Sequence, residues 1–414
     1  MKSSRISGFY KLSIEERLQK IKEFADLSDE DIEILKKNSF KIDKADSMIE
    51  NVFSTFTLPL GTAVNFKIND KDYLIPMATE EPSVVAAASN GAKIAREKGG
   101  FKAETTDPVM IGQIQLITEN PKEAEKLVLE NKDKMFDIAN KQDSTLVKFG
   151  GGVKDVKTKI LKEDMLLIHI LVDCRDAMGA NAVNTMCEAL APYIENLTDG
   201  SVVLRIISNL ADRRLVKVKA VFDKEKLGGE EVVDSIIKAY ELAELSPYRT
   251  ATHNKGIMNG IDAVVLASGN DTRAIEAGAH SFAAKDGKYS PLTKYEKNKD
   301  GDLVGTLEMP MALGTVGGAT RVHPTAKVVM KILGVKSSSE LAKVAGAVGL
   351  AQNFAALKAL SAEGIQRGHM RLHARNISET AGAKGELAGK IAEKMISEEN
   401  ISVSRAKELL KELK

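Results

Sequence analysis

The pattern of hydrophobic and polar residues predicts helices and strands in alternation along the chain. Alternating and β-branched positions predict strands over 63–68 and 73–75, and the Ala-rich stretch over 84–97, which follows Pro82, predicts a helix. Ser13-Ile14-Glu15-Glu16 is a capping box, so residues 1–50 are expected to form short helices that make an arm packed on a neighbour. This mixture is typical of an α/β (α+β) fold.

The middle of the chain has the clearest pattern of elements. Strands are predicted over 112–118, 146–161, 165–172 and 201–207, and helices over 121–139 and 181–194. The strand over 146–161 joins the two apolar stretches 146–149 and 156–161, with a bulge at Gly150-Gly151-Gly152. This is the β-α-β-β-α-β order of a ferredoxin-like unit. We therefore expect a small domain, residues 109–210, inserted into a large mixed α/β domain of residues 1–108 and 211–363. A separate helical C-terminal piece, residues 364–414, ends in the amphipathic stretch 401–413.

Length, charge and cysteine content narrow the class of protein. A chain of 414 residues fits two or three domains. The 59 basic and 58 acidic residues nearly cancel, so charge gives no reason to expect nucleic acid or an anionic membrane as the main partner. Cys174 and Cys187 are too few for a disulfide framework, and no stretch has the length of a signal peptide or a membrane span. We expect a cytoplasmic protein with reduced thiols.

A lysine and an aspartate lie in two Gly- and Asn-rich segments. Lys255 belongs to the segment His253–Gly260 and Asp271 to Ser268–Arg273, and the apolar run Ile261–Ala267 separates them. The run predicts a strand that carries both residues toward a common site, where each is a charge partner for the other. A solvated surface ion pair is the alternative, and the density of Gly, Asn, His and Met favours the buried pair.

Two further segments have residues suited to catalysis or binding. Glu80 and Glu81 precede Pro82-Ser83 at a predicted strand-to-helix junction. Helix capping explains one of the two carboxylates. Two adjacent carboxylates are also suited to keep one of them protonated, so that it can act as a general acid. The segment Asp176–Asn181 combines small residues with free amides before a helix, which lets a phosphate approach the helix N-terminus. No Gly-x-Gly-x-x-Gly follows a strand and no Walker A pattern occurs, which disfavours a Rossmann domain or a P-loop.

Two Gly-containing segments leave alternatives open. His369 and His373 lie one helical turn apart, which suits a metal, but Met370 stands where a zinc protease has Glu, so a metal site is the weaker interpretation. A histidine in this Gly-flanked, Arg-rich segment also suits proton delivery near neutral pH. The turn Gly314–Thr320 permits either close ligand approach or tight packing.

Taken in order, several motifs resemble class II 3-hydroxy-3-methylglutaryl-CoA (HMG-CoA) reductases, the soluble bacterial and archaeal form. The motifs are Glu50-Asn51-Val52, Glu81–Ser89, Asp176–Asn181, the Lys255 and Asp271 segments and Gly368-His369-Met370. The likeness covers nearly the whole chain and is strongest from Glu50 to Asn376. Phe53-Ser54 and Ser268 depart from the usual Ile-Gly and Thr of the family.

The resemblance implies a reaction and four catalytic roles. HMG-CoA is reduced to mevalonate and CoA, through mevaldehyde, by two hydrides from NADH or NADPH and without a metal. Lys255 would stabilise the oxyanion and Asp271 would hold and tune that lysine. Glu81 would donate the proton at the mevaldehyde step, and His369 would protonate the departing CoA thiolate.

The resemblance also implies binding residues and an assembly. Arg249 would bind the free carboxylate, and the residues around the acyl portion would be Ser83, Asn209, Asn259 and Gln352. The dinucleotide would bind at Asp176, Met178, Gly179, Ala180 and Asn181, with Asp143 near the adenosine ribose, where an acid favours NADH. The family places His369 on a mobile C-terminal flap and the active sites at a homodimer interface, and a larger assembly stays open. Two other functions also stay open: a non-catalytic CoA-thioester-binding protein of the same fold, and a metal-dependent hydrolase using His369 and His373.

Overall fold

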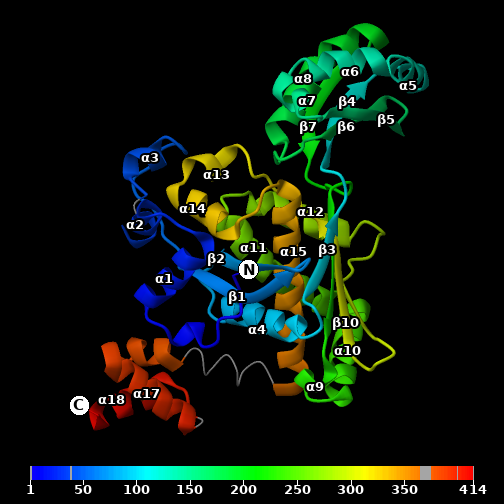
Figure 1. Ribbon diagram of the computed structural model, residues 1–414. Helices are drawn as coiled ribbons and strands as arrows, with labels where there is room; N and C mark the ends of the chain where they lie inside the picture. The colour runs from blue at the N-terminus through cyan, green and yellow to red at the C-terminus, as the bar shows by residue number, and fades with distance from the viewer. Residues whose placement is uncertain (1, 38–39, 364–373, 399, 414) are drawn as a thin grey trace.

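The chain folds around two β-sheets (Figure 1). The computed structural model describes residues 2–37, 40–363, 374–398 and 400–413. Within these ranges, no helix has both the length and the apolar character that a membrane span requires. The two sheets and the helices around them confirm the predicted α/β class.

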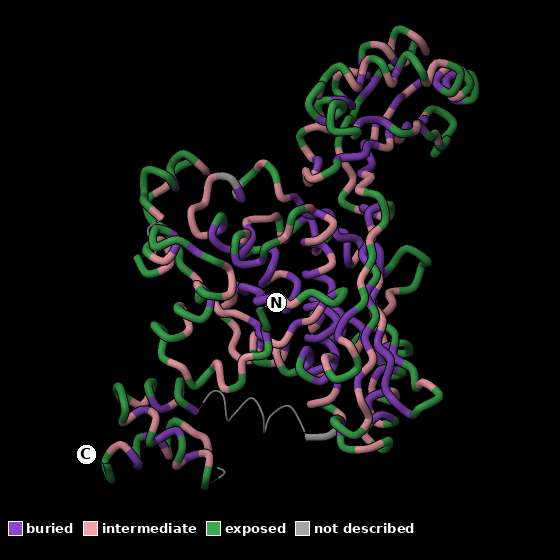
Figure 2. The backbone as a smooth tube through the Cα atoms, viewed as in Figure 1, coloured by how far each residue is buried: buried purple, intermediate pink, exposed green. Residues whose placement is uncertain are grey.

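A six-stranded sheet and three central helices form the larger of the two packed units. The strands are β1 (Leu60–Ile68), β2 (Lys71–Ala78), β3 (Phe101–Thr105), β8 (Leu215–Phe222), β9 (Thr293–Lys297) and β10 (Leu303–Pro310), in the order β2-β1-β3-β8-β10-β9. The helices α4 (Val84–Arg96), α11 (Pro247–Ala267) and α15 (Ser338–Lys358) pack on one another and on this sheet. Helix α15 is buried on almost every side and lies at the centre of the main core, as Figure 2 shows.

Small residues allow the central helices to approach closely. A Cβ atom at Gly91 of α4 would lie 2.5 Å from the carbonyl oxygen of Ala351 in α15, and one at Gly349 of α15 would lie 2.7 Å from Ile261 of α11. Larger side chains at these crossings would push the helices apart. The tight packing therefore fixes α11 and the residues on its exposed side.

The second sheet belongs to a smaller unit that projects from the rest of the chain (Figure 1). Its strands are β4 (Val109–Ile117), β5 (Gly152–Lys162), β6 (Met165–Asp173) and β7 (Ser201–Ser208), all antiparallel, in the order β5-β6-β4-β7. Helices α5 (Pro121–Glu130), α6 (Lys132–Asn140) and α8 (Ala180–Thr198) share its core. This is the predicted β-α-β-β-α-β order. Cys174 and Cys187 are free thiols in this unit, as expected, and burial raises the pKa of each to about 12.

Two predicted elements of the small unit are wrong in detail. The helix expected over 121–139 is two helices that meet at Asn131. The strand expected over 146–149 is helix α7 (Ser144–Lys148), because the carboxylate of Asp143 caps it and accepts the N–H of Leu146 at 2.8 Å. The strand β5 begins after it, at Gly152.

The remaining helices surround the large sheet and form the two ends of the chain. They are η1 (Phe9–Lys11), α1 (Ile14–Ala25), α2 (Asp29–Lys37), α3 (Ile42–Asp46), α9 (Lys224–Leu227), α10 (Glu230–Leu245), α12 (Thr272–Ala283), α13 (Gly318–Val322), α14 (Pro324–Leu333), η2 (Ala359–Glu363), α17 (Gly385–Ser397) and α18 (Val403–Glu412). The predicted capping box at Ser13 and Glu16 is confirmed. The N-terminal arm packs on its own chain, since Ile21 and Leu27 share a core with Val328 and Ile332 of α14.

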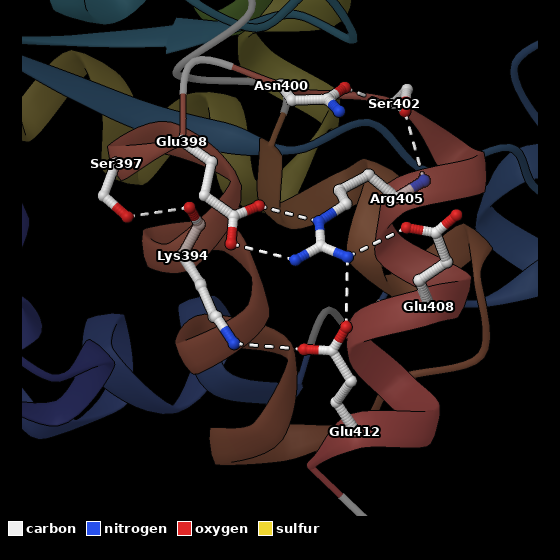
Figure 3. A network of polar contacts seen from close by, with 8 residues as sticks. All are labelled: Lys394, Ser397, Glu398, Asn400, Ser402, Arg405, Glu408 and Glu412. Carbon is white, nitrogen blue, oxygen red and sulfur yellow. Dashed lines mark hydrogen bonds and ion pairs between the residues drawn. The ribbon is translucent and has the colours of Figure 1, made fainter.

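The C-terminal helices α17 and α18 have a core of their own and an ion-pair network between them. Arg405 donates to both carboxylate oxygens of Glu398, at 2.7 and 2.9 Å, and also contacts Glu408 and Glu412 (Figure 3). Lys394 reaches Glu412 at 3.1 Å. Planar bidentate pairing of this kind defines the angle at which two helices meet.

Candidate active site

Lys255 lies on a helix and not in a turn. Helix α11 continues without a break from Pro247 to Ala267, so the strand predicted over 261–267 is wrong. The Gly and Asn residues of this segment favour a turn locally, but the packing of α11 against α15 stabilises the helix instead. Lys255 and Asn259, four residues apart, lie on the same side of α11 and are both at least partly exposed.

Glu81 meets Lys255 in the structure. The Lys255 Nζ atom lies 3.0 Å from Glu81 Oε2, and the two side chains are 61% and 36% exposed. Glu81 lies in the short turn between β2 and α4, as the predicted junction requires. An ion pair this open contributes little to stability, so a substrate can displace either partner at low cost.

Two predicted substrate residues have buried polar atoms without a partner. Among the residues described, neither Ser83 Oγ nor Gln352 Oε1 has a hydrogen bond. Ser83 also has a φ of 76°, a left-handed backbone that is costly for a residue with a Cβ atom. Gln352 of α15 packs against Gly260 of α11, since a Cβ atom added at Gly260 would lie 3.0 Å from the Cβ atom of Gln352. Unsatisfied buried groups are rare in folded proteins, and a missing ligand is one explanation for them.

Arg249 adds a positive charge in the first turn of α11. It is half-buried, burial lowers its pKa, and no carboxylate of the described ranges pairs with it. Burial and then the charge of Arg249 lower the pKa of the nearby His253 to about 3. His253 is therefore neutral, and its Nε2 lies 2.6 Å from Thr293 Oγ1. Arg249 is left as the cation available to an anionic ligand.

Asp271 lies at the other end of α11 from Lys255. It is the N-cap of α12, accepts the N–H of Ala274 at 3.1 Å and pairs with Arg273 at 3.3 Å. Both Asp271 and Lys255 lie in the described part of the chain, and they share no hydrogen bond or ion pair. The helix from Lys255 to its end at Ala267 rises by about 18 Å. The predicted Lys255–Asp271 pair is therefore not formed within one chain.

Asp271 instead borders a pocket that it shares with the predicted dinucleotide loop. The pocket has a volume of about 810 Å³, and Asn270, Asp271, Gly314 and Met178 line one part of it. The Asn270 side chain bonds Gly314 in both directions, at 3.1 and 2.8 Å. A Cβ atom at Gly314 would lie 2.7 Å from the Met178 nitrogen, so the turn at Gly314 is packed directly against the loop.

The loop Asp176–Asn181 ends in an open helix N-terminus. Gly179 is the N-cap of the 19-residue helix α8 with a φ of 109°, and no side chain caps this end. A Cβ atom at Gly179 would lie 2.4 Å from Cys174 Sγ, so only glycine fits. Uncapped N–H groups and the helix dipole suit a phosphate, and the loop therefore fits a dinucleotide. The Asp176 carboxylate is used otherwise, since it accepts the N–H of Ser338 at 2.7 Å.

The other predicted site residues are exposed, cap a helix or lie outside the described residues. Asn209 is exposed on the link from β7 to β8, and Asp143 caps α7. His369 and His373 lie outside the described residues. Within the described ranges, no group of three His, Cys, Asp or Glu side chains could hold a metal ion.

One buried residue of this region escaped the sequence analysis. Arg214 is only 5% exposed and donates to the carbonyl oxygens of Ala177 and Met178, at 2.9 and 3.2 Å. Its neighbour Arg213 is exposed. The sequence does not indicate which of the two adjacent arginines is buried, apart from the alternation of buried and exposed residues that begins with β8.

Comparison with known proteins agrees with this arrangement. The family described as hydroxymethylglutaryl-coenzyme A reductase matches residues 13–374. The chain belongs to this family. It is 58% identical to the 3-hydroxy-3-methylglutaryl-coenzyme A reductase of Archaeoglobus fulgidus over 100% of this chain and 95% of that protein. The resemblance to the HMG-CoA reductase family found in the sequence is thereby confirmed.

Two solved structures of the HMG-CoA reductase family are also similar to the chain. An HMG-CoA reductase from Streptococcus pneumoniae superimposes with a TM-score of 0.84 at 41% identity, covering 99% of each chain. A class II reductase from the same organism, bound to NADPH in open conformations, has a TM-score of 0.83 at 42% identity and covers 86% of this chain and 99% of that one.

Proposed function

We propose that this protein reduces HMG-CoA to mevalonate and CoA with two equivalents of NADH or NADPH, as an enzyme of the mevalonate pathway. The observation that carries the proposal is the open Lys255–Glu81 pair, in a chain of this family. The unpartnered polar atoms of Ser83 and Gln352 support it, because they are free to bind the acyl portion. Asn259 and Asn209 complete the proposed acyl contacts.

The substrate side acts through charge. Arg249 binds the free carboxylate of the substrate, because no carboxylate of the described residues neutralises it. The Lys255 ammonium then lies near the thioester carbonyl and stabilises the negative charge that develops on oxygen. Glu81, 3.0 Å from Lys255, donates a proton to that oxygen at the aldehyde step. His369 protonates the departing thiolate, which keeps the thiol from adding back.

The dinucleotide side binds the reductant. Bound NADH or NADPH supplies the hydride in each step. The start of α8, from Gly179 to Asn181, holds the phosphates, and Met178 borders the same pocket as Asp271. We assign Asp143 to the adenosine ribose, where its charge would favour NADH over NADPH. We place the domain limits at 108/109, 210/211 and 363/364, so that the small domain holds the dinucleotide and the C-terminal flap holds His369.

We infer that the active site forms between two copies of the chain. The separation of Lys255 from Asp271 along α11 supports this, because Asp271 of a second copy can then reach Lys255 of the first. In a symmetric dimer of Lys255→Ala and Asp271→Asn chains, one site carries both changes and the other carries neither. A random mixture of the two inactive variants should therefore regain about a quarter of the normal activity. Mixtures that stay inactive, with dimers verified by mass, would exclude a shared site.

The proposed reaction is tested by absorbance at the nicotinamide band. Mixing the protein with HMG-CoA and NADH, or NADPH, should oxidise two dinucleotides for each CoA thiol released. Binding of HMG-CoA without oxidation of either dinucleotide would favour the non-catalytic CoA-thioester-binding protein. Stoichiometric zinc together with hydrolysis that a chelator abolishes would favour the metal-dependent hydrolase.

A further inference from the structure

Arg214 lies where the chain returns from the small unit to the large one. It follows β7 and immediately precedes β8. The outgoing and returning segments run side by side here, since Thr106 accepts the N–H of Leu215 and donates to the Arg213 carbonyl through its hydroxyl, at 2.8 and 2.7 Å. The guanidinium of Arg214 is thus buried at the crossing of the two units.

The acceptors of Arg214 come from three separate segments. Nη1 donates to the carbonyl oxygens of Ala177 and Met178, and Nη2 donates to the carbonyl oxygen of Leu313 at 2.5 Å and to Ser338 Oγ at 3.1 Å. No carboxylate of the described residues lies within ion-pair distance of it. A planar guanidinium is the side chain suited to hold several fixed oxygens at once.

Ser338 joins this contact to the substrate side. As the first residue of α15, it donates its N–H to Asp176 and its hydroxyl to the Arg175 carbonyl, at 2.7 and 3.0 Å. The same helix carries Gln352. Arg214, Asp176 and Ser338 therefore attach the dinucleotide loop to the helix that holds a proposed substrate residue.

We propose that Arg214 is a positioning residue that sets the direction of the dinucleotide loop. In a trans peptide the C=O and the following N–H point in opposite directions. By binding the Met178 carbonyl, Arg214 turns the N–H of Gly179 away from itself and toward the open start of α8. The inference rests on the proposed binding of the dinucleotide by this loop.

Steady-state kinetics of Arg214→Gln and Arg214→Lys test the role, with the adjacent exposed Arg213→Gln as control. A small displacement of a binding group weakens binding steeply, so we expect the KM for the dinucleotide to rise about tenfold or more. The KM for HMG-CoA should change less than about twofold, and Lys should rescue little because it offers one donor point instead of a planar fork. Equal rises in both KM values, or an unchanged dinucleotide KM, would overturn the proposal.

Gly314→Ala tests the same loop without touching the buried charge. Its Cβ atom would meet the Met178 nitrogen at 2.7 Å and push the loop, whereas Gly389→Ala in α17 adds a methyl group where no atom lies within 4 Å. The first should raise the dinucleotide KM selectively and the second should not. If Arg214→Gln fails to fold, this pair decides the matter, because an unchanged dinucleotide KM in a folded Gly314→Ala would overturn the proposal.

Asn181→Asp separates the inference from the proposed function. A carboxylate in the first turn of α8 stabilises the helix but repels a phosphate. If this variant leaves the dinucleotide KM unchanged, the loop does not bind the dinucleotide and the proposed function of the loop fails. If the variant weakens dinucleotide binding while Arg214→Gln does not, only the positioning role of Arg214 fails.

Discussion

The proposed substrate side and the proposed dinucleotide side of the site differ in how their charged groups are held. Lys255 and Glu81 pair with side chains 61% and 36% exposed, whereas Arg214 is 5% exposed and bound by neutral oxygens. The exposed pair opens at small cost, but loss of the buried guanidinium would leave carbonyl groups without donors. The groups proposed to act on the substrate are accessible, whereas the guanidinium proposed to position the loop is buried and hydrogen-bonded.

Removing the accessible cation should have the largest effect on activity and the smallest on folding. Lys255→Ala should lower kcat by about 10²- to 10³-fold, the usual cost of losing one oxyanion stabiliser. The thermal midpoint should stay close to that of the unchanged protein, because the pair is exposed. Calorimetry beside the nicotinamide assay checks both, and Lys93→Ala on α4 serves as a control. A large fall in the midpoint of Lys255→Ala would break the comparison.

Two arginines provide a second test of the comparison. Removal of Arg214 should lower the free energy of unfolding by about 1 to 3 kcal/mol for each buried carbonyl oxygen that is left without a donor. Arg405 of α18 contacts three carboxylates, Glu398 at the end of α17 and two on its own helix, yet these partners are partly exposed to water. Arg405→Ala should therefore lower the urea midpoint less than Arg214→Gln does, even though Arg405 has more charged partners. A larger fall for Arg405→Ala would mean that charge count outweighs burial in this protein.

Asp262 provides the test with the smallest expected effect. This acid lies on the same helix as Lys255, its Oδ1 atom is buried, and no cation of the described residues pairs with it. Burial, then the hydrogen bond and repulsion from Glu276, raise its pKa well above the ordinary value. Glu276 also lies 2.7 Å from His280 Nε2. The folded protein then keeps a proton that the unfolded chain has released, so this acid lowers stability as the pH rises from about 4 toward the raised pKa.

Asp262→Asn should remove that decline. The urea midpoint of the variant should rise relative to that of the unchanged protein between about pH 4 and about pH 8, since the amide does not ionise. Asp43→Asn on the exposed helix α3 is the control and should show no such gain. A parallel course of the Asp262→Asn and unchanged midpoints over this range would contradict the buried, proton-holding acid.

Several local features could be predicted from the sequence because they depend on neighbouring residues. The capping box at Ser13 and the alternation in β4 and β6 are local patterns, and the structure has them. Helix α11 was mispredicted because its Gly and Asn residues favour turns locally, while their small size allows it to pack against α15. The helix at 144–148 differs from the predicted strand because the short apolar run at Leu146, Val147 and Phe149 favours a strand locally, whereas the carboxylate of Asp143 caps a helix.

The site residues divide in the same way. Residue type and position in the chain suggest Glu81, Lys255 and the Gly179 loop as candidate site residues, whereas Ser83 is a candidate only through the resemblance to the family. The partner of Lys255 within the chain, the unpartnered atoms of Ser83 and Gln352, and the burial of Arg214 instead of Arg213 depend on segments far apart in the sequence. Sequence alone determined which groups are available for catalysis. Tertiary structure decided which of them meet and which are desolvated, because both depend on distances in space that local patterns do not contain.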